Sequence, residues 1–440
     1  MEPPSTAASC PGEHGTLADW LVYLEQLHPT TIAMGLERVA RVLDSLALHP
    51  GWPILTVGGT NGKGSTCAML ESILHAGGYR VGLYTSPHLL HYNERVRVAR
   101  VPVGDTELCR AFAEVERARG RTPLTYFEFG TLAAMIVFLR ARLDVVILEV
   151  GLGGRLDAVN AFDCDVAVIA SIDLDHMEYL GDTREKIAFE KAGIFRRGKP
   201  AVVSEPECPR SMMEHAQAIG AQLLRIGHDF ACAGDGTQWR YRGPCGTRGG
   251  LPYPALRGEY QLRNAAAAIT ALDALRDRLP VSMQDIRRGL LETDVAGRFQ
   301  VLPGRPTVIL EVAHNPHAAR GLAENLRRMG AFRETIAVFG MLKDKDITGV
   351  VAQVKDHVTR WLVADIRERR GASAAQLREA LVGVGVTADI VAFESVGAAF
   401  REACRIASAN DRILVFGSFL TVAQAMAERT QTDTKGRASR

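Results

Sequence analysis

Val57-Gly58-Gly59-Thr60-Asn61-Gly62-Lys63-Gly64-Ser65-Thr66 is the stretch of sequence that decides the fold. It follows the apolar run 53–57 and precedes the amphipathic run 67–74, so the sequence predicts a buried strand, a glycine-rich turn and a helix. Glycines leave backbone N–H groups accessible, and these groups form an anion cradle together with the helix N-terminus. Lys63 would place a positive charge on the terminal phosphates. We therefore expect a nucleoside-triphosphate site.

This loop departs from the common phosphate-binding pattern at two positions. Its first glycine is one residue too close to the lysine, and Gly64 stands where a hydroxyl residue usually follows. Ser65 and Thr66 come next and offer hydroxyls to a bound metal ion. A glycine-rich turn without a bound anion is the alternative interpretation, and the strand–turn–helix context favours the nucleotide site.

Length and composition indicate a globular enzyme. A chain of 440 residues predicts two domains, with three as an alternative. The hydrophobic fraction of 47% and the charged fraction of 23% are typical of soluble proteins. A net charge of +2 gives no bulk attraction to nucleic acid or to a membrane, so we expect neither as a partner.

The cysteines and the apolar runs predict a cytoplasmic location. The eight cysteines form no C-x-x-C pair, which suits a reducing compartment and argues against a zinc site or a disulfide framework. The N-terminus has no basic region followed by an apolar core, so no signal peptide is expected. The apolar run 131–143 is too short for a membrane span and contains Arg140 and Arg142.

Apolar runs alternate with helical patterns along most of the chain. The sequence predicts disorder over 1–15, helices over 16–21, 35–43, 105–119, 127–143, 183–195 and 259–276, strands over 81–85, 144–150, 166–172 and 200–203, and a small hairpin excursion over 225–253. Continuous β-branched runs separated by helices are typical of a parallel sheet that is covered on both faces. The fold class is therefore α/β.

A second alternating series begins at Thr307. Its predicted strands are 307–312, 335–339, 359–364, 389–393 and 412–416, which suffices for a separate doubly wound domain. The last predicted helix covers 421–428, and a loose polar tail is expected from Thr430. With a boundary near Gly297, we expect an ATP-binding domain over 16–296 and a Rossmann-like domain over 297–440.

Ser86, Glu149 and His176 lie at or just past predicted strand ends, where parallel sheets bind ligands. Glu149 ends an apolar strand and is a candidate for binding Mg²⁺, the alternative being a carboxylate that faces solvent. His176 follows the next strand, where a lone histidine is more often structural than a metal ligand. Lys191, read alone, is typical of an exposed lysine on an amphipathic helix.

Six motifs in register resemble one family. They are 59–65, Thr85-Ser86-Pro87-His88 with Asn93-Glu94-Arg95, 149–160, Asp175-His176 with Leu180-Gly181, Glu190-Lys191-Ala192-Gly193-Ile194, and Ala313-His314-Asn315-Pro316-His317. From about residue 31 to about 422 the chain resembles the dihydrofolate synthase/folylpolyglutamate synthase family of the Mur ligase superfamily. The shifted hydroxyl after Lys63 is then a family feature.

The resemblance implies that ATP binds between a larger ATPase domain and a smaller Rossmann-like domain. The implied ATP-binding residues are Thr60, Asn61, Gly62, Lys63, Gly64, Ser65, Asn264, Arg298 and Glu311. Ser86, Glu149 and His176 match metal ligands, with two Mg²⁺ ions expected. Lys191 matches a lysine that CO₂ converts to a carbamate, which turns a cation into the oxygen ligand that a hard divalent ion prefers.

The implied catalytic residues are Lys63, Lys191 and His314. Lys343 is a further contributor from the second domain, or else part of a solvated charge run. The family usually carries Asp where this chain has Glu311, so we expect the same nucleotide contact with altered geometry.

The resemblance also implies three substrate-binding segments. Their residues are Thr31, Ile32, Ala33, Met34, Thr125, Tyr126, Phe127, Glu128, Leu156, Asp157 and Ala158. The early loop often carries an acidic residue where this chain has Ala33, which puts its pterin contacts in doubt.

The implied reaction activates a carboxylate as an acyl phosphate and joins it to L-glutamate. The expected acceptors are 7,8-dihydropteroate and reduced folates, and the expected oligomeric state is a monomer. One alternative is glutamate extension of folates only, and another is a Mur-type ligase with a different carboxylate acceptor. A regulatory nucleotide switch is a third alternative, but the chain contains no N-K-x-D guanine motif.

Overall fold

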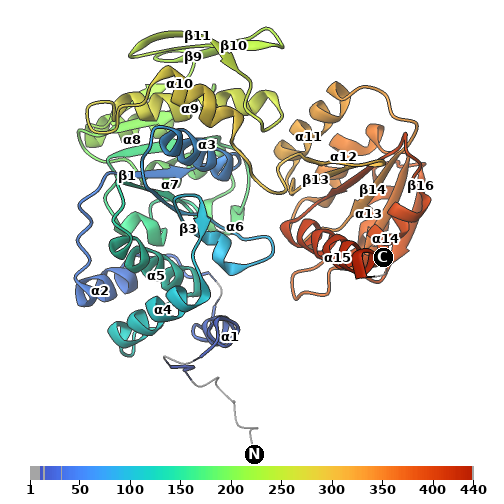
Figure 1. Ribbon diagram of the computed structural model, residues 1–440, viewed down its shortest axis with the longest axis horizontal. Coiled ribbons are helices and arrows are strands. Elements are labelled where there is room, and N and C mark those ends of the chain that lie inside the picture. The colour runs from blue at the N-terminus through green and yellow to red at the C-terminus, as the bar shows by residue number, and fades with distance from the viewer. Residues whose placement is uncertain (1–9, 13–14, 31, 439–440) are drawn as a thin grey trace, which may run out of the picture. The chain divides into compact units, whose positions relative to one another are not determined.

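The computed structural model describes residues 10–12, 15–30 and 32–438 of the chain (Figure 1). The chain divides into two compact units, one of Met1–Pro254 with Leu262–Thr293 and one of Ala255–Gln261 with Asp294–Arg440. Residues 1–9 and 13–14 lie outside the described residues, and with them most of the N-terminal segment for which disorder is predicted. No helix in the described part of the chain is long and apolar enough to cross a membrane.

The first unit is built on an eight-stranded sheet, counted over the described residues, with the order β4-β3-β2-β5-β1-β6-β7-β8. The parallel strands are β1 (Ile54–Gly58), β2 (Val81–Tyr84), β5 (Val145–Glu149), β6 (Val166–Ile169), β7 (Pro200–Val203) and β8 (Gln222–Arg225). Every residue of β1, β5 and β6 is buried, as the continuous apolar runs predicted. The predicted parallel sheet is confirmed, and β1 with its loop lies between β5 and β6.

The sequence patterns missed the outer strands of this sheet. β3 (Val96–Val98) and β4 (Val101–Pro102) are antiparallel additions at one edge, and β8 closes the other. All three are short and carry charged, proline or only half-buried residues, so no apolar run marks them.

Helices cover the sheet of the first unit. They are α1 (Leu17–Gln26), α2 (Glu37–Leu46), α3 (Lys63–Ala76), α4 (Asp105–Arg119), α5 (Tyr126–Arg140), α7 (Arg184–Ala192), α8 (Arg210–Ile219), α9 (Glu259–Ala274) and α10 (Met283–Leu291). Trp20 of α1, Phe112 of α4 and Phe129 of α5 pack ring against ring in the core beneath. The prediction extended α5 to residue 143, but the helix ends at Arg140 and Arg142 adopts a positive φ of 49° in the turn that follows.

A small antiparallel sheet replaces the predicted hairpin. It consists of β9 (Ala231–Gly234), β10 (Gln238–Gly243) and β11 (Gly246–Pro252), drawn in yellow-green beside α9 and α10 in Figure 1. Tyr241 hydrogen-bonds through its hydroxyl to Thr270 and Asp273 of α9, both at 3.0 Å. Arg248 of β11 also pairs with Asp273, at 2.6 Å, so one buried carboxylate anchors this sheet to α9.

The second unit contains a six-stranded sheet, counted over the described residues, with the order β12-β13-β17-β14-β15-β16. Its strands are β12 (Gln300–Leu302), β13 (Thr307–Glu311), β14 (Thr335–Phe339), β15 (Arg360–Ala364), β16 (Asp389–Phe393) and β17 (Arg412–Phe416). Only the edge strand β12, which the sequence did not predict, is antiparallel. Phe339, Trp361 and Phe416 form the aromatic centre of its core.

Five α-helices pack on this sheet in the described residues: α11 (Pro316–Arg328), α12 (Ile347–Val354), α13 (Ala374–Gly383), α14 (Val396–Ile406) and α15 (Phe419–Ala438). The expectation of a loose tail from Thr430 is wrong, because α15 continues to Ala438. No proline interrupts the run after Phe419, and its first glycine is Gly436, so the backbone has no strong signal to end the helix earlier.

Candidate active site

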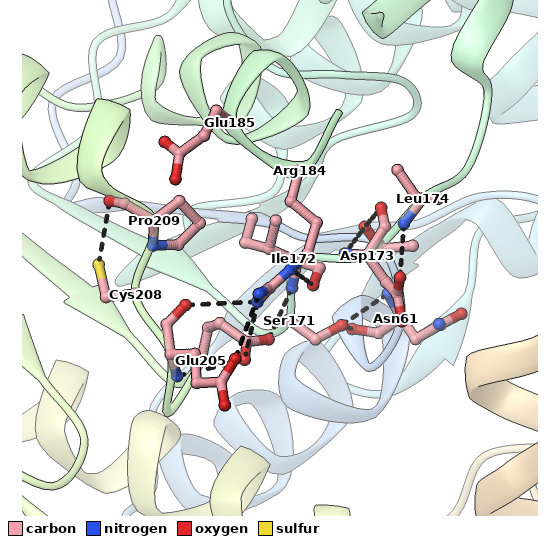
Figure 2. Close-up of polar contacts among 12 residues, drawn as sticks. Asn61, Ser171, Ile172, Asp173, Leu174, Arg184, Glu185, Glu205, Cys208 and Pro209 are labelled. Atoms are coloured by element: carbon pink, nitrogen blue, oxygen red, sulfur yellow. Dashed lines mark hydrogen bonds and ion pairs between the residues drawn. The ribbon is translucent and has the colours of Figure 1, made fainter. Parts of the chain in front are cut away.

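The glycine-rich loop connects β1 to α3 and is held by the segment that follows β6. The backbone N–H of Thr60 donates to the carbonyl of Ser171 at 2.8 Å, and the N–H of Asn61 donates to the Ser171 hydroxyl at 3.0 Å. The hydroxyl of Thr60 lies 3.0 Å from the carbonyl oxygen of Asp173. Figure 2 shows Asn61, Ser171 and Asp173 together at this contact. The conformation of the loop is therefore set by the neighbouring strand end.

The Ser171–Asp173 segment is itself fixed from its other side. The N–H of Ile172 donates to Glu205 at 3.0 Å, and Arg184 pairs with the same carboxylate at 3.3 Å (Figure 2). The guanidinium of Arg184 also donates to the carbonyl of Ile172. The loop therefore rests on a second layer of polar contacts.

Two glycines of the loop occupy positions that a side chain would not fit. Gly59 has a φ of 140°, and a Cβ atom there would lie 3.1 Å from the backbone nitrogens of Ala170 and Ser171. Gly62 has a φ of 84°, and a Cβ atom there would lie 2.8 Å from Oδ1 of Asn264. The buried Asn264, on α9, is thereby placed beside the loop, where the resemblance implies a nucleotide contact.

Lys63 begins α3, and its ammonium lies over the loop. Nζ donates to the carbonyls of Gly59 at 3.0 Å and Thr60 at 3.2 Å. The side chain thus adds a positive charge to a helix N-terminus, where backbone N–H groups already favour anions. Of the two hydroxyls that follow, Thr66 donates to the carbonyl of Gly62 at 2.9 Å, and Ser65 is buried in the first turn of α3.

Glu149 ends β5 directly beside this helix start. Its side chain is buried, and a Cβ atom on Gly64 would lie 3.7 and 3.8 Å from its two carboxylate oxygens. The backbone N–H of Ser86, which follows β2, donates to Oε2 of Glu149 at 3.1 Å. The structure therefore brings Ser86, Glu149 and the phosphate loop to one edge of the sheet, and the alternative of a solvent-facing Glu149 is wrong.

His176 lies past the end of β6, at the start of the short helix α6 (Met177–Leu180). It adopts a positive φ of 50°, and its side chain is partly exposed. Oδ1 of Asp175 accepts the His176 N–H at 2.9 Å, while Oδ2 lies 3.9 Å from Nε2 of the ring. Asp175 was not among the predicted site residues, although it stands next to one of them.

Lys191 is buried in the last turn of α7, so its interpretation as an exposed lysine is wrong. Burial and the nearby charge of Lys63 lower its pKa to about 7, against the opposing effect of Asp175 and Asp157. Residues 151–155 pack on the last turn of α7: a Cβ atom on Gly154 would lie 2.9 Å from the backbone carbonyl of Lys191. A buried lysine therefore lies near the charge of Lys63.

The predicted substrate segments meet around residues 151–157. A Cβ atom on Gly153 would lie 3.6 Å from Cε of Met34, and one on Gly151 would lie 2.7 Å from the Phe127 ring. Asp157 is buried and accepts the N–H of Leu152 at 2.8 Å; burial raises its pKa to about 7. The prediction for Thr31 lies outside the described residues.

Glu128 and Thr125 are engaged in the start of α5. The two residues form a capping box, in which Oε2 of Glu128 accepts the Thr125 N–H at 2.7 Å. Glu128 also pairs with Arg38 at 2.7 Å, and Arg38 donates to the carbonyl of Ala33 at 2.6 Å. Thr125 and Glu128 thus fix the start of α5 beside the predicted pocket. Arg38, which the sequence did not single out, connects the carbonyl of Ala33 to α5 through Glu128.

In the second unit, two of the predicted residues, Arg298 and His314, lie against Phe419. The guanidinium carbon of Arg298 lies 5.3 Å from the centroid of the Phe419 ring, and the His314 ring lies 6.3 Å from it. Glu311 ends β13, is buried, and accepts the N–H of Phe299 at 2.9 Å. Burial raises the pKa of Glu311 to about 7, against the opposing charge of Arg298. Lys343 is exposed, as expected for a solvated charge run.

The residues at the edge of the first sheet suit a divalent cation that is shared with phosphates. No group of three or more His, Cys, Asp or Glu side chains in the described residues could hold a metal ion by itself. Glu149 and Ser86 instead provide one buried carboxylate and one hydroxyl-bearing residue near the helix start that carries Lys63. His176 adds an imidazole past the end of β6, the strand next to β1. Mg²⁺ is commonly bound in this way, by one or two carboxylates and by substrate phosphates. The residues therefore fit the metal that the resemblance implies.

Comparison with known proteins defines first the class and then the family. The Mur ligase middle domain matches residues 57–272, and the Mur ligase glutamate ligase domain matches residues 297–419. The "Dihydrofolate synthase/folylpolyglutamate synthase" of Escherichia coli (strain K12) is 49% identical over 411 residues, which cover 93% of this chain and 94% of that protein. The protein of the same name from Haemophilus influenzae is 42% identical and covers 93% and 96%.

Solved structures agree with this likeness over nearly the full chain. "E.coli FolC in complex with DHPP and ADP" superimposes with a TM-score of 0.92 at 47% identity and covers 96% of this chain and 100% of that one. A bifunctional folylpolyglutamate synthase/dihydrofolate synthase from Yersinia pestis, complexed with AMPPNP and Mn ion, gives a TM-score of 0.89 at 47% identity with the same coverage. The chain belongs to the dihydrofolate synthase/folylpolyglutamate synthase family. The resemblance and fold class expected from the sequence are confirmed.

Proposed function

We propose that this chain is an ATP-dependent ligase that joins L-glutamate to 7,8-dihydropteroate and adds γ-linked glutamates to reduced folates. The observation that carries the proposal is the position of Glu149 and Ser86 beside the phosphate loop of Lys63, in a chain 49% identical to a dihydrofolate synthase/folylpolyglutamate synthase. The names of the relatives state this activity. This chain's own residues provide a phosphate loop and candidate metal ligands, which the activity requires.

The reaction follows from the weakness of a carboxylate as an electrophile. A carboxylate oxygen of the acceptor attacks the γ-phosphorus of ATP, the bond to the β-phosphate oxygen breaks, and an acyl phosphate and ADP form. The amino group of L-glutamate then attacks the acyl carbon, loses a proton and displaces orthophosphate. Lys63 and the N–H groups at the start of α3 stabilise the negative charge that develops on the phosphoryl group.

Ser86, Glu149 and His176 are the residues that would hold Mg²⁺. Bound Mg²⁺ neutralises charge on the phosphate oxygens during phosphoryl transfer. Two homologous structures contain Mn and AMPPNP, which supports a divalent cation at the nucleotide. Lys63 would exchange its contacts with the carbonyls of Gly59 and Thr60 for contacts with phosphate oxygens.

Lys191 would act as a carbamate. The ammonium first loses a proton. The neutral amine then attacks CO₂, a nitrogen–carbon bond forms and a second proton is released, so that a cation is replaced by an anion with two oxygen atoms. Burial of the amine and its lowered pKa favour the neutral form that this step requires. The change also converts the repulsion between Lys191 and Lys63 into attraction.

The remaining predicted residues divide between nucleotide and acceptor. Asn264 would contact the nucleotide from α9, and Arg298 and Glu311 would do so from the second unit. His314 would contribute to catalysis. The pteridine would bind among Met34, Phe127 and the segment that contains Asp157, whose raised pKa lets it keep a proton near neutral pH.

A product assay tests the proposal and separates its alternatives. ADP release should require L-glutamate together with dihydropteroate or tetrahydrofolate. Product from tetrahydrofolate alone would restrict the activity to folylpolyglutamate synthesis, and ATP turnover that does not depend on any pteridine would contradict the proposed function.

A further inference from the structure

Arg95 lies between the loop after β2, which contains a proposed metal ligand, and the start of α5, which belongs to the proposed pteridine pocket. It ends the short 3₁₀ helix η1 (Tyr92–Arg95), next to β3. Its Nε donates to Nδ1 of His88 at 2.8 Å. Its guanidinium carbon lies 5.4 Å from the ring centroids of both Tyr92 and Tyr126. One side chain thus contacts both the loop after β2 and the first residue of α5.

The loop after β2 contains Ser86, one of the proposed metal ligands. The carbonyl of Arg95 accepts the Thr85 N–H at 2.9 Å, immediately before Ser86. The neighbouring Glu94 accepts the N–H groups of Leu89, Leu90 and His91, each at 2.8 Å. The loop is therefore fixed on both sides of Ser86 by two consecutive residues of η1.

The other contact of Arg95 reaches the proposed pteridine pocket. Tyr126 is the first residue of α5 and precedes Phe127, whose ring lies against Gly151. The rings of Tyr126 and Tyr92 are 5.9 Å apart at an angle of 77°, and the guanidinium lies at the same 5.4 Å from each. A cation within about 6 Å of a ring centroid is attracted to it. The planar guanidinium can stack on rings while its edge donates a directed hydrogen bond, which a lysine does not reproduce.

We propose that Arg95 is a positioning residue that fixes the Ser86 loop and the start of α5 to each other, and so sets both metal and pteridine affinity. This inference rests on the proposed function, because it takes Ser86 as a metal ligand and Tyr126 as part of the pteridine pocket. Loss of the Arg95 side chain removes the hydrogen bond to His88 and the contact with the Tyr126 ring together. A residue with a merely structural role would lower stability and leave the affinities of the folded protein unchanged.

The first test measures two affinities in the full-length protein. Mn²⁺ is titrated into the AMPPNP complex and followed by electron paramagnetic resonance, and dihydropteroate binding is measured by calorimetry. Arg95→Ala should weaken both by about tenfold, a factor typical of energetic coupling between sites. Arg110→Lys, an exchange on the exposed face of α4, is the matched control and should change neither.

Arg95→Lys keeps the positive charge, and its two affinities are measured instead if the alanine variant fails to fold. It should also weaken both affinities, because the ammonium cannot stack on the two rings and donate to His88 together. Unchanged Mn²⁺ and dihydropteroate affinities in a folded Arg95 variant would overturn the proposal.

A double-mutant cycle tests the connection itself. Tyr126→Ala removes a side chain from the pteridine pocket, yet it should weaken Mn²⁺ binding, and it should do so only while Arg95 is present. Additive effects of the two substitutions on Mn²⁺ affinity would refute a shared role. If wild-type protein releases ADP with glutamate and either dihydropteroate or tetrahydrofolate but the cycle is additive, this inference alone fails. If it releases ADP with neither acceptor, the proposed function fails.

Discussion

Oδ1 of Asn264 lies 2.8 Å from the place that a Cβ atom on Gly62 would take. Gly62 is the residue before α3, and it adopts a left-handed conformation with a φ of 84°. A side chain at this position would therefore meet two obstacles, the backbone strain of a positive φ and the amide of a buried asparagine.

Gly78 allows these two obstacles to be separated. It has a φ of 87°, nearly that of Gly62, but a Cβ atom there has no atom within 4 Å. Gly62→Ala and Gly78→Ala should each destabilise the protein by about 1 kcal/mol through backbone strain. Only Gly62→Ala should also weaken AMPPNP binding, by about tenfold, because it displaces Asn264. Chemical denaturation and calorimetric titration measure the two effects, and equal AMPPNP affinities would remove Asn264 from the nucleotide site.

Replacement of Lys191 should abolish synthesis without loss of the fold. Lys191→Ala removes the proposed carbamate, so we expect product formation to fall by about 100-fold, as when a metal-site partner is lost. Lys186→Ala lies on the same helix but removes an exposed side chain paired with Asp182, and it should leave activity unchanged. Near-normal activity of Lys191→Ala in air would contradict the carbamate proposal.

The buried amine also predicts how stability depends on pH. The folded state holds the pKa of Lys191 at about 7, below the ordinary lysine value of 10.5 that applies to the unfolded chain. Between these values the unfolded chain binds a proton that the folded chain does not, so the contribution of this group to stability increases with pH. In CO₂-free buffer, the free energy of unfolding of wild type relative to Lys191→Met should rise by about 1 kcal/mol per pH unit above pH 7. A difference that stays constant would show that the amine is not desolvated.

Glu149 should control the response to magnesium. Glu149→Gln keeps the size and can still accept the Ser86 N–H but removes the charge, so the Mg²⁺ concentration for half-maximal ADP release should rise by at least about tenfold. Glu190→Gln is a suitable comparison, because Glu190 pairs with Arg155 and is not a proposed metal ligand. A magnesium titration identical to that of wild type would remove Glu149 from the metal site.

Much of the fold could be predicted because the pattern of apolar residues is strong wherever strands are buried on both faces. The strands 200–203, 335–339 and 412–416 agree with the structure to the residue. The strand 389–393 does so too, although it is a largely exposed edge strand, because most of its residues are apolar. The weak edge strands could not be found in this way. β3 has only three residues, of which the middle one is Arg97, and β8 is only half-buried. Patterns of hydrophobicity record burial, and edge strands are buried least.

The site was harder to predict, because several of its contacts depend on tertiary packing. Lys191 stands in the last turn of an amphipathic helix, a position where lysine usually faces solvent, and it is buried only because of the tertiary packing around α7. Arg38 and Phe419 contact predicted residues, yet their sequence neighbourhoods carry no signal for those contacts. Asp175 could have been predicted from the sequence, because it adjoins His176 and carries a carboxylate.

The hydrogen bonds from Thr60 and Asn61 to Ser171 have a consequence for the entropy of nucleotide binding. Fixing the backbone of one residue costs about 1–2 kcal/mol, and a loop that orders only around its ligand subtracts this cost from the affinity. Here the same cost falls on folding, since the strand end already fixes the loop. A change that loosens Ser171 would therefore appear as weaker nucleotide affinity with every phosphate-contacting atom retained, and its effect would be largely entropic.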